Sequence, residues 1–447
     1  MNLSRQLVIQ KTINNLLTPR GRLIESSNCL LSSSSSSTLY DIAVVGGGIV
    51  GTATARLLSA KYRDFKIILL EKEKKLASHQ SGANSGVIHS GIYYPPGSLK
   101  AKLCVEGSKK IYKYLKEKNI NYRRCGKLIV AVNSSELFRL EKLYERAIKN
   151  NVPGVEMIGP EGMTTIQPGV KGIRSLWSPN TGIVDWGLVT QAFAQDFKSN
   201  GGQVRVNFEV KNFDLVDGNP VKVIISNKTA PEKIEARWVI TAAGLFSDKI
   251  AQMTGSPVNP RIVPFRGEYL LLKGEKKNQI KTNIYPVPDP RLPFLGLHFT
   301  PRLDGNVWLG PNAILATKRE GYSYRDFDLR DMIDSLTHPG LIKLSLKYLK
   351  EGAQEIYRSL NVEAQVKILQ QYIPSIKKED VIRGPTGVRA QALDENGNLV
   401  EDFVFDSGTG SFKDHVLHVR NAPSPGATSS LAIAEMIVQQ MEKKFFK

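Results

Sequence analysis

A glycine-rich turn interrupts the apolar pattern near the start of the chain. In "YDIAVVGGGIVGTATARLLSAKY" (40–62), the apolar run Ile42–Val45 stops at glycine, and apolar residues then recur at helical spacing as far as Leu58. This pattern predicts a buried strand, a tight turn and a helix. A second apolar run, Ile67–Leu70, ends at Glu71. The resulting β-α-β unit is typical of the opening of a doubly wound nucleotide-binding sheet.

The same order of elements returns twice, far along the chain. A strand, a glycine turn and a helix are predicted again at 238–255 and at 415–444. The nucleotide-binding pattern is therefore discontinuous, and other segments are inserted between its parts.

The inserted segments have a different character. Helical periodicity at 98–119 and 134–150 flanks an apolar run at 126–132 that predicts a strand. Strand-like runs interrupted by prolines fill 263–315, which indicates antiparallel pairing, and 325–376 is helical and charged.

These patterns predict an α/β protein of two domains. A Rossmann-type nucleotide-binding domain is expected from 39–120, 181–262 and 381–447. An inserted substrate domain with an antiparallel sheet and helices is expected from 121–180 and 263–380.

The first turn has the spacing Gly46-x-Gly48-x-x-Gly51. In a β-α-β unit the first glycine permits the tight turn, the second lets the backbone approach a pyrophosphate, and the third lets helix and strand pack closely. Glu71 lies 20 residues after Gly51, at the strand end where an acid accepts hydrogen bonds from ribose hydroxyls. Together these residues predict a bound dinucleotide, either NAD or FAD.

Residues 1–38 differ in composition from the rest of the chain. They end in a serine run, and their single acid, Glu25, stands against the basic residues Arg5, Lys11, Arg20 and Arg22. An arginine-bearing, serine-rich, acid-poor N-terminus is typical of a mitochondrial transit peptide. The alternative is a disordered leader without a targeting role.

The net charge and the cysteine content limit the kinds of partner and metal site that the chain can have. The formal net charge is +19, of which +16 lies after residue 38, and this balance suits an anionic membrane or an acidic substrate. The basic residues are scattered and form no nucleic-acid-binding motif, so no nucleic-acid partner is expected. Cys29, Cys104 and Cys125 lack the spacing of a zinc site, so no metal is predicted.

Nine segments of the chain have distinctive motifs. They are "GGGIVG", "LLEKE", "HQSGANSGVIHSGIYYPPGSLKAKLC", "CGKLIVA", "PFRGEYLLL", "YPVPDPRLPFLGLHFT", "GPNAILATKREGY", "GVRAQA" and "NAPSPGATS". Together they resemble the L-2-hydroxyglutarate dehydrogenase family, which belongs to the D-amino-acid-oxidase and glycerol-3-phosphate-dehydrogenase fold group. The resemblance runs from about Tyr40 to the C-terminus.

The resemblance implies that FAD is the dinucleotide. In that fold group the segment after the second strand wraps the flavin, here with Ser81, Asn84, Ser85, Gly86 and Val87. It also places Val210 at the adenine and Gly244 where the dinucleotide passes close to the backbone. The start of the last helix would face the pyrimidine end of the flavin and stabilise negative charge there, around Gly426, Ala427 and Thr428. The alternative is an ordinary capped C-terminal helix.

Oxidation of a 2-hydroxy acid requires particular groups in the active site. Hydride passes from C2 to flavin N5, a base accepts the hydroxyl proton, and cations hold the carboxylates. The resemblance implies that Arg389 binds the substrate anion, and Arg266, with Tyr269 beside it, is the second candidate. We predict His298 as the base and His89 as an orienting group, although His89 competes for the role of base. Salt bridges for the arginines and structural hydrogen bonds for the histidines are the alternatives.

The resemblance implies a function as well. It is the FAD-dependent conversion of L-2-hydroxyglutarate to 2-oxoglutarate, a metabolite repair reaction, in the mitochondrial matrix or at the matrix face of the inner membrane. Electrons would pass to an acceptor other than NAD, such as a quinone pool or a carrier flavoprotein, and the basic surface would favour peripheral attachment to anionic lipid. Two alternatives stay open: an amine or glycerol-3-phosphate oxidoreductase on the same fold, and a non-catalytic flavoprotein assembly factor.

Overall fold

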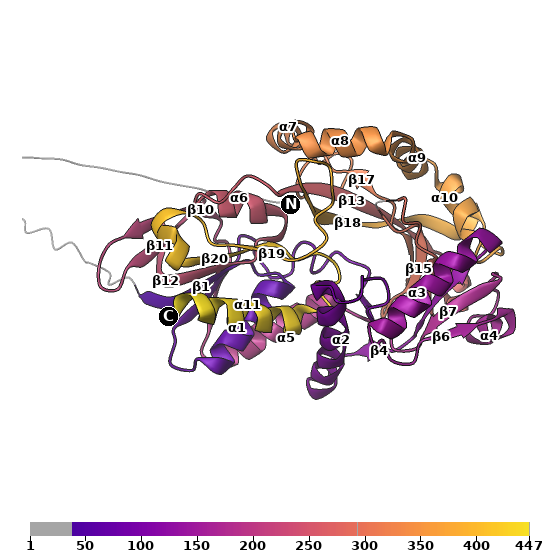
Figure 1. The fold of residues 1–447 in the computed structure, drawn as a ribbon, viewed down its shortest axis with the longest axis horizontal. Coiled ribbons are helices and arrows are strands. Elements are labelled where there is room, and N and C mark those ends of the chain that lie inside the picture. Colours follow the sequence, from indigo (N-terminus) through magenta and orange to yellow (C-terminus); the bar gives the residue numbers. More distant parts are fainter. Residues whose placement is uncertain (1–37, 293, 447) are drawn as a thin grey trace, which may run out of the picture. The chain divides into compact units, whose positions relative to one another are not determined.

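Two large sheets, each assembled from segments far apart in the sequence, organise the chain (Figure 1). The computed structural model describes residues 38–292 and 294–446, and Thr38–Lys447 form one compact unit. The predicted leader, 1–38, lies outside the described residues except for Thr38.

The first sheet has eight strands and a parallel centre, which confirms the predicted doubly wound α/β fold. Its order is β10 (Val210–Val216), β11 (Lys222–Asn227), β12 (Lys233–Thr241), β1 (Leu39–Val45), β2 (Ile67–Leu70) and β9 (Gln203–Arg205), with β20 (Val416–Asn421) on β12 and β19 (Val404–Asp406) on β20. β1 pairs in parallel with both β12 and β2, and β12 pairs in parallel with β20. Central parallel strands are covered on both faces, which explains why β1 and β2 are almost continuously apolar.

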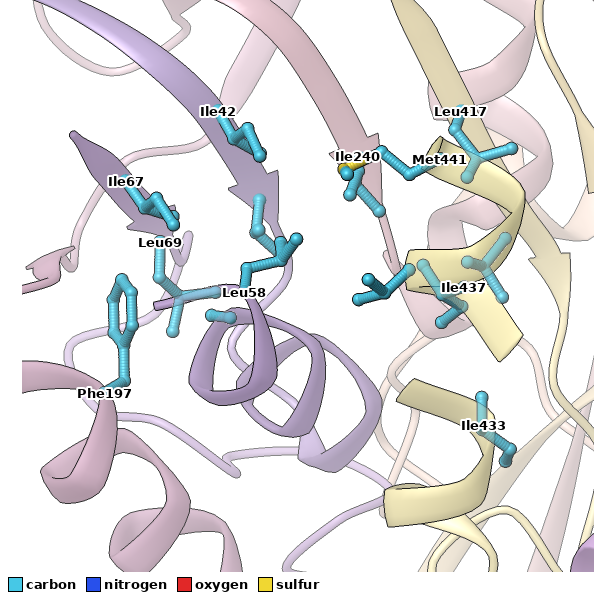
Figure 2. Packing of buried hydrophobic residues seen from close by; sticks show 14 of the residues in the cluster. Ile42, Leu58, Ile67, Leu69, Phe197, Ile240, Leu417, Ile433, Ile437 and Met441 are labelled. Atoms are coloured by element: carbon cyan, nitrogen blue, oxygen red, sulfur yellow. The ribbon is translucent and has the colours of Figure 1, made fainter. Parts of the chain in front are cut away.

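Helices α1 (Ile49–Lys61), α5 (Trp186–Ser199) and α11 (Ser430–Phe445) pack on this sheet. Figure 2 shows Leu58 of α1 and Ile437 of α11 in one apolar core with Ile42 and Leu69 of the strands. Each fully buried aliphatic side chain of this kind stabilises the fold by about 1.5–3 kcal/mol. The core therefore holds the glycine turn between β1 and α1 in place.

The second sheet has nine strands. Its order is β17 (Ile314–Leu315), β13 (Arg261–Leu272), β16 (Val307–Gly310), β15 (His298–Pro301), β14 (Asn283–Pro286), β5 (Lys127–Ala131), β7 (Arg174–Ser178) and β6 (Glu156–Ile158), with β18 (Val381–Leu393) on β13. The pairs within 263–315 are antiparallel, as predicted, whereas β14 and β5 are parallel. The predicted boundary at residue 381 assigns β18 to the nucleotide-binding domain, but this strand pairs along its length with β13 of the second sheet.

A small third sheet and further helices complete the fold. The sheet contains β3 (Val87–Ile88), β8 (Gly182–Val184) and β4 (Tyr122–Arg123). The remaining helices are α2 (Leu99–Glu117), α3 (Leu137–Lys149), α4 (Pro160–Ile166), α6 (Ser247–Gln252), α7 (Leu329–Leu336), α8 (Pro339–Lys347), α9 (Leu349–Leu360) and α10 (Val362–Leu369). Figure 1 shows α7 to α10 following one another in an arc. Among the described residues, no helix is both long enough and apolar enough to cross a membrane.

Candidate active site

The glycine turn is as tight as its spacing predicts. Gly46 has φ +116°, and a Cβ there would lie 2.3 Å from the carbonyl oxygen of Ala242. A Cβ on Gly51 would lie 1.9 Å from the carbonyl oxygen of Gly46, so α1 packs directly against the turn. Gly48 precedes α1 without a capping side chain of its own, and Ser81 Oγ instead accepts a hydrogen bond from Ile49 N at 2.8 Å. The N-terminus of α1 is therefore bounded by backbone and one hydroxyl.

Glu71 faces this turn from the end of β2. Its carboxylate accepts hydrogen bonds from Gly47 N at 2.7 Å and from Glu73 N at 2.8 Å. The carbonyl oxygen of Glu71 accepts from Phe208 N, two residues before Val210, the buried first residue of β10. The structure thus brings Val210 close to the predicted ribose-binding acid.

The segment after β2 folds on itself beside the second sheet. Asn84 accepts a hydrogen bond from Gly86 N at 2.9 Å and donates to the carbonyl oxygens of Gln80 and Ser81. Gly86 has φ +76°, and a Cβ there would lie 2.1 Å from a guanidinium nitrogen of Arg302. Ser85 lies between Asn84 and Gly86 and is partly exposed.

Gln80, in the same segment, links three parts of the chain. Its side-chain oxygen accepts a hydrogen bond from Ala390 N of β18 at 3.0 Å. Gly244 has φ +53°, and a Cβ on it would lie 3.1 Å from the side-chain nitrogen of Gln80. Gly244 and the 79–89 segment are therefore neighbours, although about 160 positions separate them in the sequence.

The turn before α11 packs against the 79–89 segment. Thr428 Oγ1 accepts a hydrogen bond from His89 N at 3.0 Å and donates to the carbonyl oxygen of Val87 at 3.5 Å. Gly426 and Ala427 lie in this turn, and the helix itself begins at Ser430. The hydroxyls of Ser429 and Ser430 are buried and have no hydrogen-bond partner within the described chain.

Four ionisable side chains, which we call the site cluster, lie beyond that turn: His89, Lys127, His298 and Arg389. Lys127 and Arg389 are each near enough for their charges to act on both histidines. The ring of Tyr285 stacks on His298 with centroids 3.9 Å apart and has Lys127 Nζ 4.1 Å from its centroid. Tyr269 is also close, since the charge of Arg389 acts on its hydroxyl.

Both histidines are neutral in this environment. Burial, with a smaller contribution from Lys127 and Arg389, lowers the pKa of His298 to about 3 against the hydrogen bond to Gly296. Burial and the same cations, together with His298, lower the pKa of His89 well below its usual value. His298 Nδ1 lies 3.1 Å from the carbonyl oxygen of Gly296, which can only accept, so Nδ1 bears the proton and Nε2 is free.

Arg266 does not join the site cluster. In the β13–β18 register, Phe265 is opposite Arg389 and Arg266 is opposite Val388, so the two arginines lie on opposite faces of the sheet. Arg266 pairs instead with Glu268 at 3.1 Å and donates to the carbonyl oxygen of Ser323 at 2.8 Å. Its charge is already balanced within the protein.

His79 has a structural environment as well. It bonds to Tyr322 at 3.0 Å and to Glu73 at 2.9 Å, and with Glu73 and Glu320 it forms a group whose ligand atoms lie within 4.8 Å. Lys72 Nζ lies 2.8 Å from Glu73 and 2.6 Å from Glu320, so an ammonium already offsets these carboxylates.

Comparison with known proteins identifies the family. The family model described as "FAD dependent oxidoreductase" matches residues 41–440. A Caenorhabditis briggsae protein named "L-2-hydroxyglutarate dehydrogenase, mitochondrial" is 54% identical over 91% of this chain and 94% of its own. A Homo sapiens protein of the same name is 52% identical over 93% of this chain and 92% of its own. The chain belongs to the L-2-hydroxyglutarate dehydrogenase family.

Solved structures of other oxidases share the fold of this chain. An FAD-bound L-alpha-glycerophosphate oxidase from Mycoplasma pneumoniae, reduced with dithionite, is 25% identical and superposes with a TM-score of 0.72 over 91% of this chain and 95% of its own. A glycine oxidase from Geobacillus kaustophilus, 16% identical with a TM-score of 0.65 over 91% of this chain and 95% of its own, shares the fold. The FAD-dependent family and the α/β fold are both as expected from the sequence.

The residues present fit FAD, the cofactor of this family. The narrow Gly46–Gly51 turn and the free N-terminus of α1 suit a pyrophosphate, and the carboxylate of Glu71 suits a ribose. At the other end, the hydroxyls of Ser429 and Ser430 are buried and have no partner among the described residues. A bound polar group such as the flavin would satisfy them.

Sequence reasoning missed two features of the site in this family member. Lys127 was overlooked although it is the one charged residue of the apolar run "KLIVA" (127–131), and such an isolated charge in a buried strand is a usable signal. The serines Ser429 and Ser430 resemble ordinary helix-capping residues, so nothing in the sequence distinguishes them.

Proposed function

We propose that this protein oxidises L-2-hydroxyglutarate to 2-oxoglutarate with FAD as its cofactor, in mitochondria. The site cluster supports this most directly. Among the described residues, no carboxylate lies within 4.0 Å of the charged nitrogens of Lys127 or Arg389. A buried lysine without a counter-ion and an arginine without a carboxylate partner both favour an anionic ligand, and a dicarboxylate provides two negative charges. The family, whose members are named for this reaction, favours the same substrate.

In this proposal Arg389 binds the C1 carboxylate. Arg389 is exposed, and its neighbours on β18 touch the segment that surrounds the cofactor. Ala390 N donates to Gln80 Oε1 at 3.0 Å, and a Cβ on Gly387 would lie 2.5 Å from the carbonyl oxygen of Ala83. Arg389 therefore stands on the cofactor side of the cluster, where the carboxylate next to the reacting C2 belongs.

His298 accepts the hydroxyl proton in this proposal, and His89 orients the hydroxyl. The proton moves to Nε2 of His298, because Nδ1 already donates to Gly296. Burial depresses both histidine pKa values most, and Lys127 and Arg389 contribute less. Substrate carboxylates that neutralise these two cations would remove their part of the depression. FAD held at the Gly46–Gly51 turn would supply the hydride acceptor for C2, so the two electrons would leave with the hydride and His298 would keep the proton.

We also propose that the electrons pass to an acceptor other than NAD, such as a quinone pool or a carrier flavoprotein. The chain has one Gly-x-Gly-x-x-Gly motif, Gly46–Gly51, and FAD occupies that motif in this proposal. A membrane quinone would require the protein to reach a lipid surface.

A surface for such contact lies on α8 and the start of α9. Ile342, Leu346 and Leu349 are exposed there, the last two by 70% and 68%. The exposed lysines Lys343, Lys347 and Lys350 alternate with them, and 339–350 contains no acid. An exposed apolar row flanked by lysines is typical of helices that lie on anionic membranes. We propose that 339–350 binds an anionic lipid surface.

Vesicle sedimentation tests this surface. We expect the double variant L346Q/L349Q to bind vesicles containing anionic lipid at least about tenfold more weakly than the unmodified protein, since two apolar side chains are removed. L188Q, at an exposed leucine on α5, is the matched control and should bind normally. Equal binding by all three proteins would contradict the proposed surface.

Anaerobic spectroscopy tests the reaction. The purified protein should show an oxidised flavin spectrum that L-2-hydroxyglutarate bleaches and D-2-hydroxyglutarate does not. Bleaching by glycerol 3-phosphate or an amine instead would favour the other oxidoreductases of this fold. A flavin that stays oxidised with every compound would favour a non-catalytic flavoprotein.

A further inference from the structure

Lys127 is a buried cation at the start of an apolar strand. Its side chain is 1% exposed, and the other four residues of β5 are buried and apolar. Removing an ammonium from water without a counter-ion is costly, so a fold keeps such a group only where something balances it.

The other buried cations of the described chain are balanced by the protein itself. Four Lys or Arg residues are buried there, and three of them have a carboxylate partner: Arg266 with Glu268 at 3.1 Å, Arg319 with Asp248 at 2.7 Å and Arg420 with Asp406 at 3.2 Å. Lys127 is the fourth. No carboxylate of the described chain balances its charge.

The immediate neighbours of Lys127 offset its charge only in part. Its Nζ lies 4.1 Å from the ring centroid of Tyr285 and 5.1 Å from that of Tyr93, and such cation–π contacts recover less than a carboxylate would. Burial raises the pKa of the nearby Cys104 thiol to about 12, so this group stays neutral. Burial also lowers the pKa of Lys127 to about 7, which a bound anion would counteract.

The surroundings of Lys127 also have unused polar atoms. The hydroxyl of Tyr93 and Nδ1 of His89 are out of contact with solvent and have no hydrogen-bond partner among the described residues. Both lie beside the cation, since Lys127 contacts the ring of Tyr93 and its charge acts on His89. A polar ligand at this place would satisfy atoms that are otherwise left unpaired.

We propose that Lys127 binds the distal, C5 carboxylate of the substrate and so selects a dicarboxylate over a monocarboxylate 2-hydroxy acid; this rests on the proposed function. Lys127 Nζ lies 4.1 Å from the ring centroid of Tyr285, on which the ring of His298 stacks at 3.9 Å, so Lys127 lies next to the group assigned to C2. Arg389, on β18, lies beside the segment that surrounds the cofactor. We therefore assign Lys127, on β5, to the carboxylate at the far end of the substrate.

The experiment compares two substrates by anaerobic flavin reduction. L-2-hydroxyglutarate has both carboxylates, and L-2-hydroxypentanoate has the same chain length without the C5 carboxylate. For K127M we expect kcat/KM with L-2-hydroxyglutarate to fall on the order of 100-fold, and kcat/KM with L-2-hydroxypentanoate to change by less than about threefold. K127Q should behave in the same way, and K281M, at an exposed lysine before β14, should retain the preference of the unmodified protein.

Each outcome separates this assignment from the proposed function. Because K127M removes an unbalanced buried charge, it should fold, bind flavin and melt no lower than the unmodified protein; K127Q gives the same readout should K127M fail to fold. If L-2-hydroxyglutarate reduces the unmodified protein and K127M keeps the same preference between the two substrates, the role of Lys127 is overturned and the proposed function stands. Equal loss with both substrates would overturn it too, because the effect of Lys127 would then not depend on the C5 carboxylate. Unmodified protein that L-2-hydroxyglutarate does not reduce would overturn the proposed function and this assignment together.

Discussion

Two groups of charged side chains in this molecule have opposite compositions. Around Arg319, the guanidinium donates to both oxygens of Asp248 at 2.7 and 2.9 Å, to Asp334 at 2.7 Å and to the carbonyl oxygen of Leu245 at 2.6 Å. In the site cluster, Lys127 and Arg389 lie beside two histidines, and no carboxylate of the described chain is within ion-pair distance of either cation. The first group is complete within the protein, whereas the second is not.

The difference separates a structural role from a binding role. Arg319 ties α6, through Asp248, to α7, through Asp334, and its donors are used. The site cluster keeps Lys127 buried without a carboxylate partner from the described chain, which is common where a ligand of opposite charge completes the arrangement. Substitutions in the first group should therefore change stability, and substitutions in the second should change catalysis.

The largest expected effect is on stability, at Arg319. R319M leaves Asp248 buried without a counter-ion, so the free energy of unfolding should fall by about 3–5 kcal/mol. Urea unfolding followed by circular dichroism measures it. R291M, which breaks an exposed pair with Asp289, is the matched control and should leave the free energy of unfolding nearly unchanged. An equal loss of unfolding free energy in R319M and R291M would contradict the structural role of the Arg319 group.

Arg389 should show the reverse behaviour. R389M should lower kcat/KM for L-2-hydroxyglutarate by about 3–4 kcal/mol of transition-state stabilisation, on the order of 100- to 1,000-fold, because a carboxylate ligand is lost. The urea midpoint should move little, since no protein carboxylate depends on this arginine. A large loss of stability with normal kinetics of the folded fraction would place Arg389 in the structural class.

His298 should make the fold sensitive to acid. Its pKa is about 3 when folded and about 6.5 when unfolded, so below pH 6.5 the unfolded state binds a proton that the folded state does not. Stability from this residue is therefore present above pH 6.5 and is lost as the pH falls, by about 2 kcal/mol at pH 5. H298Q should flatten this dependence, as measured by urea unfolding at pH 5 and pH 7. An equally steep loss in H298Q would assign the acid sensitivity to other groups.

Arg266 should give the smallest effect on catalysis. The double substitution R266Q/E268Q removes both partners of a buried pair, so no uncompensated charge remains. We expect kcat/KM for L-2-hydroxyglutarate to stay within about threefold of the unmodified protein, less than 1 kcal/mol. A loss comparable to that in R389M would return Arg266 to the carboxylate-binding role that the sequence suggested.

The local parts of this protein are determined by the sequence. The strand, glycine turn and helix at 40–62 and the acid at Glu71 depend on contacts within one β-α-β unit, where periodicity and glycine spacing are sufficient. His89, His298 and Arg389 were likewise predicted, because the chemistry of a hydroxy acid requires such residues and long specific motifs contain them.

Only the tertiary structure decided which charges are free. Arg266 and Arg389 are both strand arginines in the sequence, and the pairing of β13 with β18 places them on opposite faces, one of them beside Glu268. Lys127 becomes part of the site because β5 pairs with β14, more than 150 positions away, which brings it against Tyr285. The alternation of apolar and polar residues along a strand shows which side chains are buried. It does not show which residues they contact, because the register between distant strands decides that.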